Sequence, residues 1–208
     1  MGTRLAGKVA VITGAARSIG AEIARSFASE GAAVVAADIL GEEAEGVVAA
    51  VRSAGGRAEA IATDISSSDQ VDRLFRRVEE QFGGLDVLVN NAMYAAGDTT
   101  MAELEEEVWD RTIDVCLKGP FLCTRRALPM MKARGGGSVI TMSSVNALFG
   151  VSETAYTAAK GGLISMMRLV AAEYGEWNIR SNVICPGTIV SSAPRRARRM
   201  RSFRLSRR

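Results

Sequence analysis

Short apolar segments alternate with longer amphipathic segments along most of this chain. Short apolar runs are typical of buried strands, whereas the segments between them carry apolar residues at helical spacing. Strands that are apolar on both faces and are joined by helices form a parallel sheet that is covered on both sides. The sequence therefore predicts an α/β protein built in three layers.

The expected strands and helices follow one another in regular order. Strands are expected over residues 8–13, 33–37, 57–62, 85–90, 138–143 and 179–184. Helices are expected over residues 18–30, 42–54, 68–82, 103–134 and 154–174, of which 103–134 forms either one helix or two. A chain of 208 residues favours a single domain, and we predict a doubly wound parallel sheet with strand order 3-2-1-4-5-6.

The composition narrows the possible chemistry. The chain has no histidine, and its three cysteines (Cys116, Cys123 and Cys185) form no CxxC pair. We therefore expect no metal site and no disulfide framework, and acid–base chemistry must use Tyr, Lys, Asp or Glu. No apolar run approaches the roughly 20 residues of a membrane-spanning helix, and the first residues lack the apolar core of a secretory signal. The sequence predicts a cytoplasmic protein with no membrane partner.

A glycine-bearing turn follows the first expected strand and opens a helix. Gly14 permits a tight turn, and Gly20 permits close packing of the helix on the strand, so the helix N-terminus can receive a pyrophosphate. Asp38, at the end of the second strand, lies 18 residues after Gly20, close to the spacing of a ribose-binding carboxylate. Asp38 favours NAD over NADP, although Arg17 could bind a 2′-phosphate. Alternatively, the glycine-bearing segment is an ordinary turn between strand and helix, and Asp38 is a solvated acid in a loop.

Tyr156 and Lys160 lie four residues apart at the start of an expected helix. That spacing places both on one helix face, where the ammonium would favour the phenolate and lower the tyrosine pKa. Tyr156 could then act as an acid or base near neutral pH. Ser143 lies 13 residues before Tyr156 and could hydrogen-bond the same substrate oxygen. Ser144 is an alternative, but the 13-residue spacing favours Ser143.

Taken together, these motifs resemble the short-chain dehydrogenase/reductase family over about residues 5–192. The matching segments are TGAARSIG at 13–20, Asp38, Asp64-Ile65, NNA at 90–92, Ser143, YTAAK at 156–160 and PGTI at 186–189. The resemblance implies a Rossmann fold and an NAD(P)-dependent oxidoreductase that interconverts a small-molecule secondary alcohol and a ketone. It implies that Tyr156 transfers the proton, that Ser143 steadies the substrate oxygen, and that Lys160 holds the nicotinamide ribose. It also implies a homo-oligomer, either a dimer or a tetramer, with the helices around 103–134 and 154–174 at the subunit contact.

The resemblance also implies a set of cofactor-binding residues. They are Gly14, Arg17, Ser18, Ile19, Gly20, Asp38, Asp64, Ile65, Asn90, Ala92, Tyr156, Lys160, Pro186, Gly187, Thr188 and Ile189. Asp64 and Ile65 would flank the adenine, Asn90 and Ala92 would line the cofactor channel, and 186–189 would cover the nicotinamide amide. Two alternatives stay open. Asn90 and Asn91 could instead stabilise the strand end, and Pro186-Gly187 could be only a turn.

Three residues depart from the family pattern. Ser18 stands where the family has its second glycine, which adds a side chain where the pyrophosphate approaches, and Met93 replaces the glycine of the NNAG motif. Cys116 stands where the family usually has an asparagine that holds a water in a proton relay. A thiol is a poor hydrogen-bonding substitute, so we expect a slowed relay. Alternatively, Cys116 is only a small buried residue.

The end of the chain departs most from the pattern. Residues 195–208 hold eight arginines and no acid, whereas residues 1–194 carry 18 basic and 23 acidic residues, a net charge of −5. We predict a catalytic domain over residues 1–192 and a disordered basic tail over 193–208, with the family's seventh strand missing. As the origin of this tail, a shifted reading frame or an artefact is favoured over a solvated tail of no specific role. A tail that binds nucleic acid or an anionic membrane is disfavoured. The rival function is a dinucleotide-binding scaffold disabled by Cys116 and the altered end.

Overall fold

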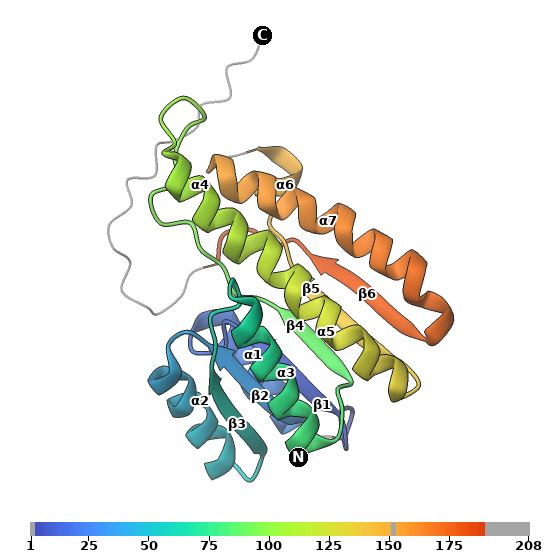
Figure 1. Cartoon of the computed structure of the whole chain (residues 1–208). Helices are drawn as coiled ribbons and strands as arrows, with labels where there is room; N and C mark the ends of the chain where they lie inside the picture. The colour runs from blue at the N-terminus through green and yellow to red at the C-terminus, as the bar shows by residue number, and fades with distance from the viewer. Residues whose placement is uncertain (1–2, 151–152, 190–208) are drawn as a thin grey trace.

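Six parallel strands form one sheet in the computed structural model, which describes residues 3–150 and 153–189 (Figure 1). Their order is β3-β2-β1-β4-β5-β6, as predicted, and every neighbouring pair is parallel. The strands are β1 (Val9–Thr13), β2 (Ala33–Asp38), β3 (Arg57–Ala62), β4 (Val87–Asn90), β5 (Gly137–Met142) and β6 (Ile179–Ile184). The doubly wound parallel sheet is confirmed.

Helices connect the strands, and most lie where the sequence predicts them. The α-helices are α1 (Ser18–Ser29), α2 (Gly41–Ser53), α3 (Ser68–Phe82), α4 (Glu106–Ile113), α5 (Gly119–Ala133), α6 (Asn146–Phe149) and α7 (Thr154–Tyr174). A π-helical segment, η1 (Asp114–Lys118), joins α4 to α5, and a short 3₁₀ segment, η2 (Gly175–Trp177), precedes β6. The stretch expected as one helix or two is thus two helices with a π-helical junction, and the short α6 was not predicted.

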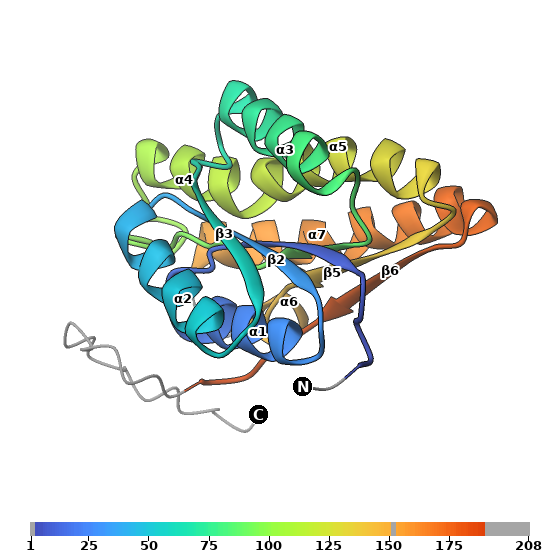
Figure 2. The ribbon, with the colours of Figure 1, turned by 90° about the horizontal axis from the view of Figure 1, so that it is seen from below.

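Two hydrophobic clusters hold the helices onto the sheet. One joins α1 and α2 to side chains of β1, β2 and β4, including Ile12, Val34 and Val89. The other joins α3, α5 and α7 to the opposite face, where Val11, Val35 and Leu88 point. Figure 2 shows α1 and α2 on one side of the sheet and α3 and α5 on the other. Because successive side chains of a strand point to opposite faces, strands apolar throughout their length, such as β1, supply both clusters.

All six strands point in the same direction, so their carboxyl ends meet at one edge of the sheet. In open α/β sheets ligands bind at this edge, in the crevice where the strand order reverses. Here the order reverses between β1 and β4. The loops after these two strands begin at Gly14 and Asn91, and the predicted site residues follow the ends of β2, β3, β5 and β6 around the same edge.

Some sequence predictions fall outside the described residues. The basic tail, residues 193–208, and the end of the domain at residue 192 lie there, as does any strand after β6. Of the helices within the described residues, none combines the length and the apolar character needed to cross a bilayer.

Candidate active site

The loop after β1 has the backbone shape that the two glycines predict. Gly14 adopts φ +67°, a conformation that favours glycine, and its N–H donates to the Ala37 carbonyl at 2.8 Å. A Cβ on Gly20 would lie 2.0 Å from the Gly14 carbonyl oxygen, so no larger residue fits there without movement. Ser18, at the position of the missing family glycine, has φ +48° and an exposed side chain. The turn therefore forms with serine, in a conformation that is strained for a residue other than glycine.

Hydrogen bonds made by the side chains of Thr13 and Asn91 hold this loop in place. The Thr13 hydroxyl accepts hydrogen bonds from the N–H groups of Asn91 at 3.0 Å and Ala92 at 3.2 Å. The Asn91 amide donates to the carbonyl oxygens of Thr13 and Gly14, both at 3.0 Å. These contacts tie the loop after β1 to the loop after β4. The contacts of Asn91 favour the alternative that it stabilises the strand end. Thr13 was not among the predicted site residues, although a polar residue ending an apolar strand is the signal that points to it.

Asn90 lies inside the sheet rather than at its edge. Its side chain is 2 % exposed, and its Nδ2 donates to the hydroxyls of Thr124 at 3.1 Å and Thr141 at 3.2 Å. The Asn90 Oδ1 has no hydrogen-bond partner in the described structure. These contacts join β4 to α5 and β5, which favours the alternative that Asn90 stabilises the strand end. Ala92 is partly buried against the core of the α3, α5 and α7 face.

Asp38 lies beside the glycine-bearing loop. Its carboxylate accepts hydrogen bonds from the N–H of Ala16 at 2.9 Å and of Leu40 at 3.0 Å. Arg17, which could have favoured a 2′-phosphate, forms an ion pair with Glu43 of α2. Of the two predicted residues, Arg17 is thus paired with Glu43, and Asp38 is the one that presents its charge to the loop.

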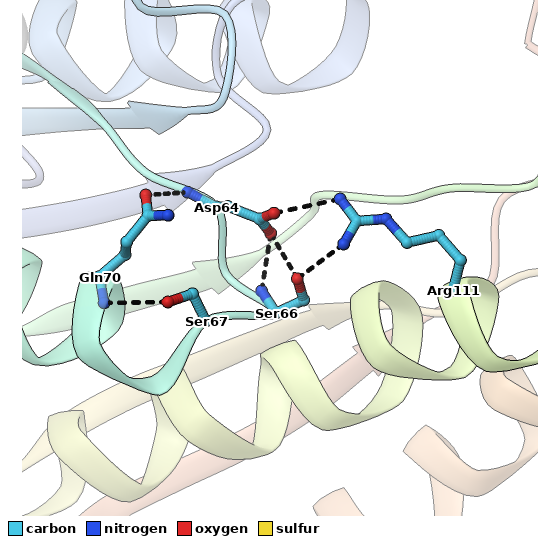
Figure 3. A network of polar contacts seen from close by, with 5 residues as sticks. All are labelled: Asp64, Ser66, Ser67, Gln70 and Arg111. Carbon is cyan, nitrogen blue, oxygen red and sulfur yellow. Dashed lines mark hydrogen bonds and ion pairs between the residues drawn. The ribbon is translucent and has the colours of Figure 1, made fainter.

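A polar network fixes Asp64 in the connection between β3 and α3 (Figure 3). Its Oδ1 accepts from the N–H and the hydroxyl of Ser66, and its Oδ2 lies 3.1 Å from Arg111 of α4. Burial alone would raise the pKa of Asp64, but the hydrogen bonds from Ser66 and Arg111 outweigh it and hold that pKa below its ordinary value. Ile65 is buried, and its side chain packs against Gly119.

Tyr156 and Lys160 share one face of α7, as their spacing predicts. The Lys160 ammonium lies 5.3 Å from the centre of the Tyr156 ring. Lys160 is 2 % exposed, and its Nζ donates to the Met142 carbonyl at the end of β5, at 2.6 Å. No described carboxylate pairs with this ammonium. A buried cation thus lies next to the phenol and beside the strand end.

The two serines after β5 point in different directions. The Ser143 hydroxyl is buried and donates to the Lys160 carbonyl at 2.8 Å, so it faces the backbone of α7. The Ser144 side chain instead lies beside the Tyr156 phenol and acts to lower its pKa. The structure therefore brings Ser144, and not the favoured Ser143, to the phenol. Counting residues along a loop does not reveal which of two successive side chains turns toward the site.

The local electrostatics differ from the expectation for Tyr156. Burial raises the pKa of Tyr156 to about 12, and a nearby thiol, Cys116, acts in the same direction against the hydrogen bond from Ser144. Burial also lowers the pKa of Lys160. The expected lowering of the phenol pKa by Lys160 is thus absent from the protein alone, because desolvation penalises both charged forms.

Cys116 lies in the π-helical segment η1, fully buried. Its sulfur accepts from the Tyr94 N–H at 3.2 Å and donates to the Tyr94 carbonyl at 3.1 Å. Burial raises the pKa of the Cys116 thiol, while the Lys160 charge acts to lower it. Cys116 is therefore both a buried residue and a neighbour of the Tyr156 and Lys160 pair.

The segment after β6 lies beside the serine-bearing loop. The Pro186 carbonyl accepts from the Val145 N–H at 3.1 Å, and residues 187–189 are exposed. The backbone thus brings 186–189 next to Ser144, at the edge where the other predicted residues meet. Of the predicted residues, the structure gathers Gly14, Ser18, Ile19, Gly20, Asp38, Tyr156, Lys160 and 186–189 around this edge, and it turns the side chains of Asn90, Ile65 and Ser143 inward.

The chain matches a known family of proteins. The model of the family described as short chain dehydrogenase matches residues 8–202. A cis-4-hydroxycyclohexanecarboxylate dehydrogenase from Sinomonas cyclohexanicum is 42% identical over 188 residues, which cover 90% of this chain and 75% of the relative. A 3-oxoacyl-(acyl-carrier-protein) reductase from Thermotoga maritima is 38% identical over 187 residues, covering 89% of this chain and 76% of the relative.

A solved structure has the same fold. The crystal structure of a protein assigned to the short-chain dehydrogenases/reductases from Burkholderia xenovorans superposes with a TM-score of 0.85 and 35% sequence identity. The match covers 90% of this chain and 77% of that protein.

Proposed function

Because the chain belongs to the short-chain dehydrogenase family, a family of oxidoreductases, we propose that it transfers a hydride between NAD and a secondary alcohol or ketone. The observation that carries the proposal is the pair of Tyr156 and Lys160 on one face of α7, with the Lys160 ammonium 5.3 Å from the centre of the Tyr156 ring. A phenol beside a buried cation can exchange a proton with a substrate oxygen.

The residues of the loop after β1 fit a dinucleotide. A Cβ at Gly14 would lie 2.7 Å from the Ala92 Cα, and a Cβ at Gly20 would strike the Gly14 carbonyl, so the absence of side chains is what keeps the loop compact at the start of α1. The free N–H groups of the helix N-terminus would receive the pyrophosphate. When bound, the nicotinamide supplies the carbon that accepts or donates the hydride. Lys160 and residues 186–189 would hold its ribose and amide.

Asp38 and Arg17 together favour NAD. The Asp38 carboxylate has further lone pairs beyond the two that bind Ala16 and Leu40, so it can accept from a ribose hydroxyl, and its charge repels a 2′-phosphate. The Arg17 guanidinium pairs with Glu43 and would have to leave that partner to bind a 2′-phosphate. We infer that NADP is used less efficiently than NAD.

We assign the hydroxyl that steadies the substrate oxygen to Ser144 instead of Ser143. Ser144 already contacts the Tyr156 side chain, so a substrate oxygen bound to the phenol would lie within reach of the same hydroxyl. The Ser143 hydroxyl is committed to the Lys160 carbonyl and holds α7 against β5. Tyr156 then donates its proton to a ketone oxygen, or takes it from an alcohol, while Ser144 donates a hydrogen bond to that oxygen.

The substrate is proposed to be a small molecule with an apolar part near the reacting carbon. Leu148 and Phe149, on α6 just after Ser144, are 56 % and 75 % exposed, and Met93, in the loop after β4, is 54 % exposed. Exposed apolar side chains beside a catalytic group are suited to an apolar ligand. The two relatives act on a hydroxycyclohexanecarboxylate and on a 3-oxoacyl carrier protein, so their names support a secondary alcohol or ketone without choosing one.

A homo-oligomer is a further part of the proposal. Phe121 of α5 and Leu169 of α7 are 45 % and 56 % exposed, on two helices that the family resemblance implies as the subunit contact. A second copy of the chain would cover them. Light scattering of the purified protein tests this, and a monomer at micromolar concentration would contradict it.

The test of the function is titration with NADH, followed by a panel of secondary alcohols and ketones monitored at the nicotinamide absorbance. We expect saturable binding, turnover with at least one compound, and a loss of turnover in Tyr156→Phe with cofactor binding retained. Saturable binding without turnover on any compound would instead support the scaffold alternative. Turnover unchanged in Tyr156→Phe would refute the assigned mechanism.

A further inference from the structure

A buried carboxylate from the β4–α4 connection holds the first turn of α7. Asp98 is 7 % exposed, and its Oδ1 accepts from the Ala155 N–H at 3.2 Å while its Oδ2 accepts from the Tyr156 N–H at 2.8 Å. Both oxygens of one carboxylate thus bind successive backbone amides, and one of these belongs to the proposed catalytic tyrosine.

Helix α7 depends on this distant residue for its cap. The first N–H groups of a helix have no partner within the helix, and a side chain just before the helix usually accepts from them. The residue in that place is Glu153, which has φ +63° and whose side chain makes no capping hydrogen bond. Asp98 accepts these hydrogen bonds instead, although it precedes Ala155 by 57 residues and Tyr156 by 58.

A second contact fixes the same junction. The Thr99 carbonyl accepts from the Thr154 N–H at 3.3 Å and from the Thr154 hydroxyl at 2.8 Å. Farther back in the same connection, the backbone of Tyr94 is held by the Cys116 sulfur. The connection is therefore anchored at two places, to η1 at Tyr94 and to α7 at Asp98 and Thr99.

We propose that Asp98 is a positioning residue for Tyr156, an inference that rests on the proposed function. The phenol can serve proton transfer only if its backbone is held at a fixed distance from the cofactor edge of the sheet. Hydrogen bonds to an ionised acceptor are shorter and stronger than neutral ones, and the Asp98–Tyr156 bond acts on the residue that carries the phenol. A misplacement of about 1 Å at a reacting group can cost about 100-fold in rate.

The decisive variant is Asp98→Asn. An amide offers one acceptor oxygen and an NH₂ group that cannot accept, so one of the two backbone N–H groups loses its partner. We expect kcat to fall about 10- to 100-fold, with the KM for NAD unchanged within about twofold because the Gly14 loop lies elsewhere. Amide hydrogen exchange at Ala155 and Tyr156 should become faster in this variant. The milder variant Thr154→Val, which removes one hydrogen bond of the same junction, should lower kcat less.

Asp86→Asn is the matched control. Asp86 is 6 % exposed and also accepts a backbone N–H, from Val9 at 2.9 Å, but it precedes β4 and so lies at the opposite end of the strands. This variant should lower the melting temperature and leave kcat and the exchange of the Tyr156 amide unchanged. It therefore separates loss of stability from loss of positioning.

Two outcomes would overturn the inference, and they differ from each other. If Asp98→Asn and Thr154→Val melt earlier but keep the kcat of the unsubstituted chain, Asp98 is structural only and the proposed function stands. If the unsubstituted chain turns over no alcohol or ketone, the proposed function fails and this inference fails with it.

Discussion

The Ser143 hydroxyl donates to the Lys160 carbonyl at 2.8 Å, while the side chain of the next residue, Ser144, lies beside the Tyr156 phenol and acts to lower its pKa. The two neighbouring hydroxyls therefore have separate tasks, one joining β5 to α7 and the other facing the proposed reaction. This division makes the two serines a matched pair for mutagenesis.

We predict that Ser144→Ala lowers kcat about 100- to 1000-fold, the usual loss when one hydrogen-bond donor to a reacting oxygen is removed. Ser143→Ala removes the bond to Lys160 and should cost about 1 kcal/mol of unfolding free energy with little change in kcat. Steady-state kinetics and urea unfolding of both variants check this. The reverse pattern, with kcat lost only in Ser143→Ala, would restore the prediction made from spacing.

The fold could be predicted from the sequence, whereas the orientation of individual side chains could not. Apolar runs such as Val9–Thr13 have no other stable place than a covered sheet, and right-handed crossovers then limit the strand order. The break at η1 and the choice between Ser143 and Ser144 depend on tertiary contacts that leave no periodic signal. The same holds for Asn90, whose amide could equally have faced a ligand, and for Asp98, whose partners lie in a distant helix.

Tyr156 should make the unfolding free energy of the cofactor-free protein depend on pH in the alkaline range. Burial raises its pKa to about 12, above the ordinary value of about 10. A group whose pKa is higher in the folded state stabilises the fold fully below its unfolded pKa, and that contribution is lost as the pH rises through the folded pKa. Between about pH 10 and about pH 12, the unfolding free energy should therefore fall more steeply for the unsubstituted protein than for Tyr156→Phe. Parallel curves in urea titrations across this range would contradict the raised pKa.

Gly20→Ala should destabilise the protein and abolish dinucleotide binding. The added Cβ would lie 2.0 Å from the Gly14 carbonyl and 2.6 Å from the Asn91 amide, so the loop that Asn91 braces must shift. Overpacking of this kind costs about 1–3 kcal/mol.

Gly46→Ala is the control, because Gly46 lies exposed on α2 with no atom within 4 Å of an added Cβ. It should raise stability by up to about 1 kcal/mol. Thermal melts and NADH titration distinguish the two, and normal NADH affinity in Gly20→Ala would contradict this account of the loop.

Asp38→Asn should shift cofactor preference toward NADP. The substitution removes the negative charge that would repel a 2′-phosphate but keeps one acceptor for Ala16 or Leu40. We expect the ratio of kcat/KM for NADP to that for NAD to rise at least about 10-fold, equivalent to about 1.4 kcal/mol.

Glu43→Gln, which releases Arg17, should raise NADP use without loss of NAD use. Glu45→Gln, which breaks the pair with Arg52 on the same helix, should change neither. An unchanged ratio in both Asp38→Asn and Glu43→Gln would show that these side chains do not read the 2′ position.

Cys116→Asn should be tolerated and should raise turnover. The thiol now bonds both the N–H and the carbonyl of Tyr94, and an asparagine amide offers an acceptor and donors for the same two groups. A donor left over beyond these two contacts could serve the proton relay that the family resemblance implies. We expect kcat to rise about fivefold, the equivalent of about 1 kcal/mol from one hydrogen bond, most clearly where proton release limits the rate. The control is Cys123→Ala. Cys123 lies on α5, is also fully buried and belongs to the hydrophobic cluster under α3, α5 and α7. This variant should leave kcat unchanged. If Cys116→Asn folds normally and kcat stays the same, Cys116 is a packing residue, and the relay does not pass through this position.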